Sequence, residues 1–318
     1  FHSTNSDGIK TPEERISQIQ LLDPDNQYPW ALTDHDCYSP NFVLPARELW
    51  IKAIWATEIS AHSSELDCSF HITCYSPTLS GSIKDRIDMA LIWKTAKVRE
   101  QIKKLQWQGF DITESDFFAW VEEKWYRKIA VSNAHISGYL FDWTRDPITS
   151  KLVHNLTNWT VHGHGFIREC LQEGGSYSEI GVVRVSQYEP EVSDLVDIAR
   201  REDIILSVAH PNFSFNKIYK KHKINGDPVA RAKYFHDKIL PILIGLGMKN
   251  YEINAIANPE QFDYLSDLVQ KTGWMNTFWS DNHGYGEIRV KHGIFWKQNP
   301  LLTQEITTPI TNKLLSFL

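Results

Sequence analysis

The sequence lacks three features that would each point to a particular class of protein. It has no run of about 18 apolar residues, so no transmembrane helix is expected. Its four cysteines form no Cys-x-x-Cys pair, which argues against a zinc finger or redox dithiol and favours a reducing compartment. Its net charge of −6 disfavours a protein that holds long duplex nucleic acid by charge alone. We therefore expect a cytoplasmic protein.

What the chain does have is a large apolar fraction and an alternation of strands and helices. At 318 residues, 42% of them hydrophobic, it can bury a large core. Runs typical of strands occur at residues 30–33, 54–57, 69–75, 204–208, 251–254 and 276–279. Helical patterns occur at residues 45–52, 191–201, 229–246 and 259–271. Because repeated βα units build a mainly parallel sheet, we predict an α/β fold closed, or nearly closed, into a barrel.

A helical insertion interrupts this alternation. Apolar residues share one face of a helix between Lys84 and Gln108, and two further helices follow at 113–126 and 134–141. We interpret the lysines of the first of these helices as a solvated face. The chain is thus predicted to divide into a barrel of residues 1–83 and 191–318 and a mainly helical cap of residues 84–190.

Histidines and carboxylates stand where the predicted strands end. His35, Glu58 and His210 each follow a strand directly, and His71 lies inside one. Any one of them alone could be an ordinary core or turn residue. The strand ends of a barrel meet at one mouth, however, and imidazole with carboxylate suits two or three clustered divalent ions. The predicted metal ligands are His2, Asp7, His35, Glu58, His71, His210, Asp281 and His283.

Five segments carry a resemblance to a known family. They are His2–Gly8, Leu32–Asp36, Thr57–Ser60, Ala209–Pro211 and Ser280–Gly284. Their sequences and their order resemble the motifs of the PHP (polymerase and histidinol phosphatase) metal-dependent phosphoesterases. The resemblance implies a distorted (β/α)7 barrel that holds two to three ions of Zn, Mn or Fe.

The resemblance also implies how the ligands are shared. It makes Glu58 a carboxylate that bridges two ions. The remaining ligands are His2 and Asp281 for one ion, His71 and His210 for the other, and Asp7, His35 and His283 for the third. The family motif begins His-x-His, and here only its second histidine, His2, is present. We expect the first histidine to precede Phe1, so the N-terminus is incomplete and a leader is left open.

The insertion resembles the helical cap of a subgroup that acts on nucleoside 3′,5′-bisphosphates and on the 5′ ends of short RNAs. That subgroup carries a Gly-Arg-Pro-His-like motif, and the matching residues here are Ser132, Asn133, Ala134 and His135. The histidine matches, whereas the arginine that would clamp a phosphate with two hydrogen bonds does not. We predict His135 as a substrate contact or general acid, with a helix-surface histidine as the alternative, and Arg184 as a phosphate contact.

The predicted reaction is hydrolysis of a phosphate ester by a metal-bound hydroxide beside Glu58. The predicted partner is a small phosphorylated substrate, a nucleotide or short oligonucleotide, with no membrane and no long duplex. Two alternatives stay open, which are a phosphatase for a small phosphomonoester such as histidinol phosphate and a catalytically silent metal-binding PHP module. Glu252, at the end of a strand, either supports the metal ligands or is purely structural. The sequence does not indicate an oligomeric state.

Overall fold

A computed structural model describes most of the chain. The described residues are 2–79, 81–125, 130–161, 165–172, 174–183, 189–224, 227–254, 275–279 and 312–318. Three predicted site residues, Arg184, Asp281 and His283, lie outside these ranges, as does the predicted helix at 259–271.

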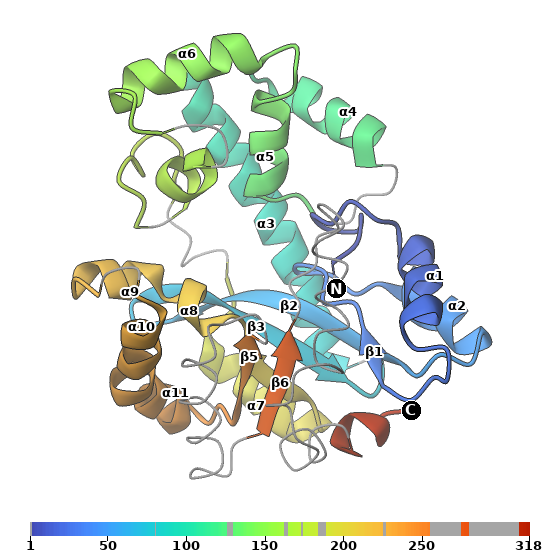
Figure 1. Cartoon of the computed structure of the whole chain (residues 1–318). Coiled ribbons are helices and arrows are strands. Elements are labelled where there is room, and N and C mark those ends of the chain that lie inside the picture. The colour runs from blue at the N-terminus through green and yellow to red at the C-terminus, as the bar shows by residue number, and fades with distance from the viewer. Residues whose placement is uncertain are drawn as a thin grey trace.

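The described strands form one curled sheet that resembles half a barrel (Figure 1). They are β1 (Trp30–Ala31), β2 (Ala53–Ser63), β3 (Cys68–Ser76), β4 (Ile205–Val208), β5 (Asn250–Asn254) and β6 (Met275–Trp279). The strands lie side by side in chain order. The pairs β1–β2, β4–β5 and β5–β6 are parallel, as repeated βα units predict, whereas β3 runs antiparallel to β2 and to β4.

The β2–β3 hairpin is where the sheet departs from the parallel prediction. The turn at 64–67 is too short to join parallel strands, so β3 must run back along β2. Residues 58–63 then pair with 68–73, which extends β2 well past the strand end predicted at residue 57. The prediction that Glu58 follows its strand was therefore wrong, because Glu58 lies in the middle of β2.

Two groups of helices surround the sheet. Those beside the strands are α1 (Pro12–Leu22), α2 (Pro40–Glu48), α7 (Val192–Glu202), α8 (Pro211–Ser214), α9 (Asn216–Lys221), α10 (Pro228–Tyr234), η2 (Phe235–Ile239) and α11 (Leu240–Leu246). The second group is α3 (Gly81–Trp107), α4 (Glu114–Trp125), α5 (Asn133–Leu140), α6 (Asp146–Thr157) and η1 (Ile167–Leu171). Figure 1 shows α3 rising from the sheet towards α4, α5 and α6. Among the described helices, none is both long enough and apolar enough to cross a bilayer.

Some helix boundaries differ from those that the sequence predicts. The helix predicted at 45–52 is α2, which begins at Pro40 and contains Pro45. Pro40 supplies the favoured first-turn proline, so the later proline is held inside the helix instead. The helix α1 was not predicted, although Thr11 and Glu14 form a capping box that marks its start. The helix α6 was not predicted either.

The buried apolar side chains gather in separate clusters. The largest packs the helices beside the strands against one face of the sheet, with Phe42, Ile59 and Phe235 among its members. A second cluster runs from Val98 to Ile180 and belongs to the helical group. The helix α3 contributes to both, because its first turns carry Ile83 and Ile87 into the first cluster. The predicted boundary at residue 84 thus falls inside one continuous helix, and the division into barrel and cap stays a prediction.

Candidate metal centre

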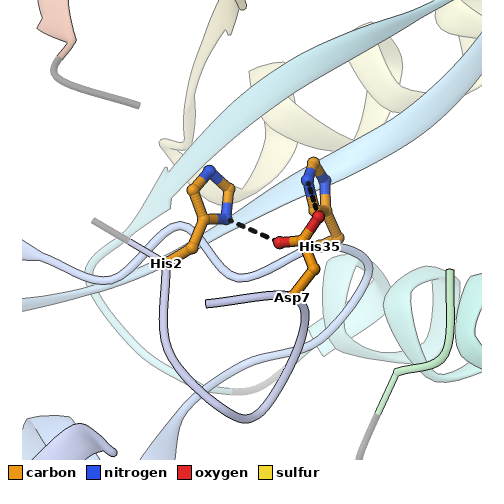
Figure 2. A group of neighbouring side chains, drawn as sticks. All are labelled: His2, Asp7 and His35. Atoms are coloured by element: carbon orange, nitrogen blue, oxygen red, sulfur yellow. Dashed lines mark ion pairs between the residues drawn. The ribbon is translucent and has the colours of Figure 1, made fainter. Parts of the chain in front are cut away.

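The N-terminal loop folds back on itself and brings two predicted ligands together. Gly8 lies directly against the peptide that follows His2, where an added Cβ would stand 2.5 Å from the His2 carbonyl oxygen. The Gly8 N–H donates to the carbonyl of Ser3 at 3.0 Å. Only glycine allows this close approach, and it leaves His2 Nδ1 3.9 Å from Asp7 Oδ1 (Figure 2).

His35 joins this pair from the segment after β1, where it forms an isolated bridge with Glu58; β1 ends at Ala31, so the prediction that His35 follows the strand directly was wrong. Its Nε2 lies 3.5 Å from Asp7 Oδ2, and its ring stacks on that of His2 with centroids 4.6 Å apart. Figure 2 shows His2, Asp7 and His35 pointing towards one another. Backbone hydrogen bonds fix the segment, since Asp36 N donates to the Glu58 carbonyl and Glu58 N donates to the Asp34 carbonyl.

Glu58 lies at the centre of the remaining ligands. Its side chain is fully buried on β2. The Oε1 atom is 2.6 Å from His71 Nδ1, 3.0 Å from His210 Nε2 and 3.6 Å from His35 Nδ1. On the other side, Oε2 is 3.6 Å from His2 Nε2. One carboxylate therefore faces four imidazoles.

The fold explains why these side chains meet. Ser60 pairs with His71 and Glu58 with Thr73, so Glu58 and His71 are diagonal neighbours on one face of the hairpin. His210 follows β4, which pairs with β3, and its backbone adopts a left-handed φ of 31°. That turn directs its ring towards Glu58 and places Nε2 3.3 Å from His71 Nδ1.

Burial and charge set the protonation of this cluster. Desolvation lowers the pKa of His35 to about 4, so its ring is neutral and can offer a lone pair. Burial alone would raise the pKa of Glu58, but His35, His210 and the hydrogen bonds from His210 and His71 hold it well below its ordinary value. The cluster therefore presents an ionised carboxylate at Glu58 and a neutral imidazole at His35, which are the protonation states that metal binding requires of these groups.

Glu252 stands behind the ligands. Its Oε1 accepts from Thr73 Oγ1 at 2.9 Å, and its Oε2 accepts from the His210 N–H at 3.2 Å. Burial, followed by the nearby Glu58, raises the pKa of Glu252 to about 8. Glu252 thus supports the backbone of His210, which agrees with a supporting role for it.

The residues present fit divalent ions. Among the described residues, two groups have ligand atoms that all lie within 4.8 Å of one another, namely His2, Asp7 and His35, and His35, Glu58 and His71. Mixed imidazole and carboxylate donors suit Zn, Mn and Fe. The described predicted ligands that the structure brings together are His2, Asp7, His35, Glu58, His71 and His210.

A cavity of about 560 Å³ opens over these ligands. Four of the predicted ligands line it, namely Asp7, His35, His71 and His210. The cavity is also lined by Lys94 and Lys97 of α3, by Ser132–Ala134 at the start of α5, and by Arg168 of η1. The helical group and the predicted ligands therefore share one cavity.

Lys94 and Lys97 correct the interpretation of the α3 lysines as a solvated face. Lys94 is largely buried and forms an ion pair with the buried Asp36, the residue after His35. Lys97 lies 3.6 Å from Glu189. Both stand on the face of α3 that carries Val98 and Gln101. Their spacing relative to these residues could have shown from the sequence that both lysines lie on the packed face of the helix.

His135 lies in α5 and is fully buried. Its Nδ1 accepts a hydrogen bond from the Ser132 N–H at 3.0 Å, and with Ser132 it forms a capping box at the start of the helix. The residues before it, Ser132–Ala134, line the cavity. The catalytic or substrate-binding role of His135 stays a prediction.

Comparison with solved structures shows which fold this is. Searches with the sequence find no matching family model and no matching curated protein. A presumed metal-dependent phosphoesterase from Bifidobacterium adolescentis aligns with a TM-score of 0.63 and 20% identity, over 90% of this chain and 87% of that one. An amidohydrolase from Chromobacterium violaceum, solved with sulfate and no metal, aligns with a TM-score of 0.63 and 17% identity over the same shares.

These likenesses show that the chain shares its mixed α/β fold with proteins named as hydrolases. At such low identity they show the fold alone.

Proposed function

We propose that this chain is a metal-dependent phosphoesterase of the PHP type. The observation that carries the proposal is Glu58, a fully buried carboxylate faced by the imidazoles of His2, His35, His71 and His210 under an open cavity. A buried charge is costly unless it is paired or binds metal. The names of the two aligned structures agree with a hydrolase.

The ligand set would hold two to three ions. Glu58 has one oxygen towards His71 and His210 and the other towards His2, which suits a bridging carboxylate. Asp7 and His35 form the side of the cluster where a third ion would bind, with Asp281 and His283 proposed to complete the set. Bound divalent ions would supply an activated water and would neutralise charge on the phosphate.

The proposed substrate is a nucleotide, such as a nucleoside 3′,5′-bisphosphate or the 5′ end of a short RNA. The cavity volume lies within the range of small-molecule sites. Lys94, Lys97 and Arg168 line the same cavity as the ligands, each beside a carboxylate, and Arg184 is proposed to add a phosphate contact. His135 is proposed as a contact or general acid, and its Nε2 carries the proton of the neutral ring because Nδ1 accepts from Ser132.

We further infer that the described sheet is part of a distorted (β/α)7 barrel and that residues 84–190 cap its mouth. The parallel pairs of the sheet support this architecture, and so do the ligands gathered on one face of it.

Elemental analysis of the purified full chain, paired with a substrate screen, tests the function. We expect bound divalent metal and release of phosphate from nucleoside 3′,5′-bisphosphates or 5′-phosphorylated RNA. Turnover of histidinol phosphate alone would favour the small-substrate phosphatase instead. Stoichiometric metal without phosphate release from any ester would favour the silent module and would overturn the proposal.

A further inference from the structure

The loop that carries His2 and Asp7 has no regular secondary structure, yet its residues are buried. His2, Ser3, Asn5 and Ser6 are all at most 1% exposed. Sites built on loops are usually less exact than sites built on strands, unless surrounding groups lock them. The structure shows what locks this one.

Asp34 receives hydrogen bonds from both ends of the loop. Its Oδ1 accepts from the Ser3 N–H at 2.6 Å and from Ser6 Oγ at 2.7 Å, and its Oδ2 accepts from Ser3 Oγ at 2.7 Å. Oδ2 also accepts from Ser39 Oγ. Ser3 follows His2 and Ser6 precedes Asp7, so one fully buried carboxylate fixes the neighbours of both ligands.

Asp34 also ties the loop to the strands. Its carbonyl accepts from the Glu58 N–H at 3.0 Å and from Thr57 Oγ1 at 2.9 Å. The next residue in the chain is His35. Asp34 thus joins the three segments that carry His2 with Asp7, His35 and Glu58, although its own carboxylate contacts none of these side chains in the hydrogen bonds above.

Arg15 holds the loop from the other side. It lies on α1 and is fully buried. Its Nε and Nη2 donate to the His2 carbonyl oxygen at 3.0 and 2.8 Å. Burial lowers the pKa of Arg15 to about 10, with Asp34 opposing that shift, so the guanidinium is charged at neutral pH. A buried charged side chain therefore fixes the backbone position of one predicted ligand, His2.

We propose that Asp34 and Arg15 are positioning residues that set the metal affinity of the ions bound by His2 and Asp7. This inference rests on the proposed metal function. An amide at position 34 offers one acceptor oxygen where the carboxylate offers two, and its NH₂ group would face hydroxyl and N–H donors. Loss of such supporting hydrogen bonds typically costs about 10–100-fold in metal affinity.

The test is calorimetric titration of the metal-stripped full chain with Mn²⁺, comparing wild type, Asp34→Asn and Asp23→Asn. Asp23 is the matched control because it is also a buried carboxylate that organises a turn. It accepts from the N–H groups of Gln27 and Tyr28 and from Trp30 Nε1. We expect Asp34→Asn to weaken the ions at His2 and Asp7 by about 10–100-fold while the ion at His71 and His210 is kept. Asp23→Asn should bind like wild type.

Ser6→Ala keeps the test decisive where Asp34→Asn fails to fold, because it removes a single donor to Asp34 and no charge. It should weaken the same ions by a smaller factor. Equal affinity in wild type and in a folded Asp34→Asn or Ser6→Ala chain would overturn the positioning role. So would an equal loss in Asp23→Asn, which would mean general destabilisation. A wild-type chain that binds no Mn²⁺ or Zn²⁺ would instead sink the proposed function itself, and the positioning role with it.

Discussion

The sheet and the helical group bury very different kinds of side chain. Around the sheet, the buried residues include many polar groups, among them Asp34, His35, Asp36 and Glu58. Among the described residues of α3 to α6 and η1, the buried polar side chains include no carboxylate; they are Gln101, His135, Ser137, Thr149 and Thr157. Burying polar groups costs free energy unless they are hydrogen bonded or bind a ligand, so the sheet gives up stability for a site. The helical group contributes an apolar core of its own, and some of its polar residues, such as Lys94, Gln101 and Asn133, line the cavity.

The largest effect is expected from Glu58→Gln, which removes the charge of the central buried carboxylate of the sheet. Loss of the carboxylate that we propose bridges two ions should remove bound metal and lower the proposed phosphoesterase activity roughly 10²–10³-fold, the scale of losing a main electrostatic group. Activity assays and elemental analysis measure both effects. Glu65→Gln is the control, because Glu65 is exposed in the turn of the same hairpin. Near wild-type turnover of Glu58→Gln in metal-supplemented buffer would contradict the assignment.

A substitution in the apolar cluster of the helical group should instead change stability and leave the metal site intact. Phe117 is fully buried and packs edge-to-face with Tyr139. Phe117→Ala should lower the free energy of unfolding by about 3–5 kcal/mol, because it leaves a cavity. Urea unfolding measures this loss, and metal titration should show unchanged affinity. If the metal affinity falls as well, the two regions do not behave separately.

Lys94 tests the junction between the regions. Its buried ion pair with Asp36 ties α3 to the segment after His35. Lys94→Met leaves that carboxylate unpaired and should cost about 3 kcal/mol in urea unfolding. The control is Lys103→Met on the same helix, where solvent screens the exposed pair with Glu100 and the loss of stability should be much smaller. Equal losses of unfolding free energy in the two variants would show that the buried Lys94–Asp36 pair contributes no more than an exposed one.

The smallest expected effect is a pH dependence confined to the helical group. Partial burial would raise the pKa of Glu169, but hydrogen bonds from Ser176 and Arg168 outweigh it and lower that pKa to about 2. A lowered carboxyl pKa adds stability above its ordinary value of 4.5, and this stability is lost as the pH falls towards 2. The stability difference between wild type and Glu169→Gln should therefore shrink from pH 5.5 to pH 3 in urea unfolding. A difference that stays constant would refute this account.

The sequence predicted the two regions to different depths. Strand runs and helix periods located most of the elements, because both are local patterns. The cluster around Glu58 was predicted because its histidines and carboxylates recur beside strands. The antiparallel β3 and the mid-strand place of Glu58 were missed, since a hairpin register depends on pairing rather than on one run. Lys94 and Asp34 were also missed as site residues, because their partners lie far away in the chain.

The β2–β3 hairpin has a consequence for how the chain folds. Glu58 and His71 meet across a short turn, whereas the helical group separates them from His210 in the sequence. Hairpins form within about 1–10 μs, and contacts distant in sequence form more slowly. We therefore expect Glu58 and His71 to be neighbours early in folding, with His210 docking last. The hairpin that carries Glu58 and His71 would then form first, and the segment that carries His210 would pack against it afterwards.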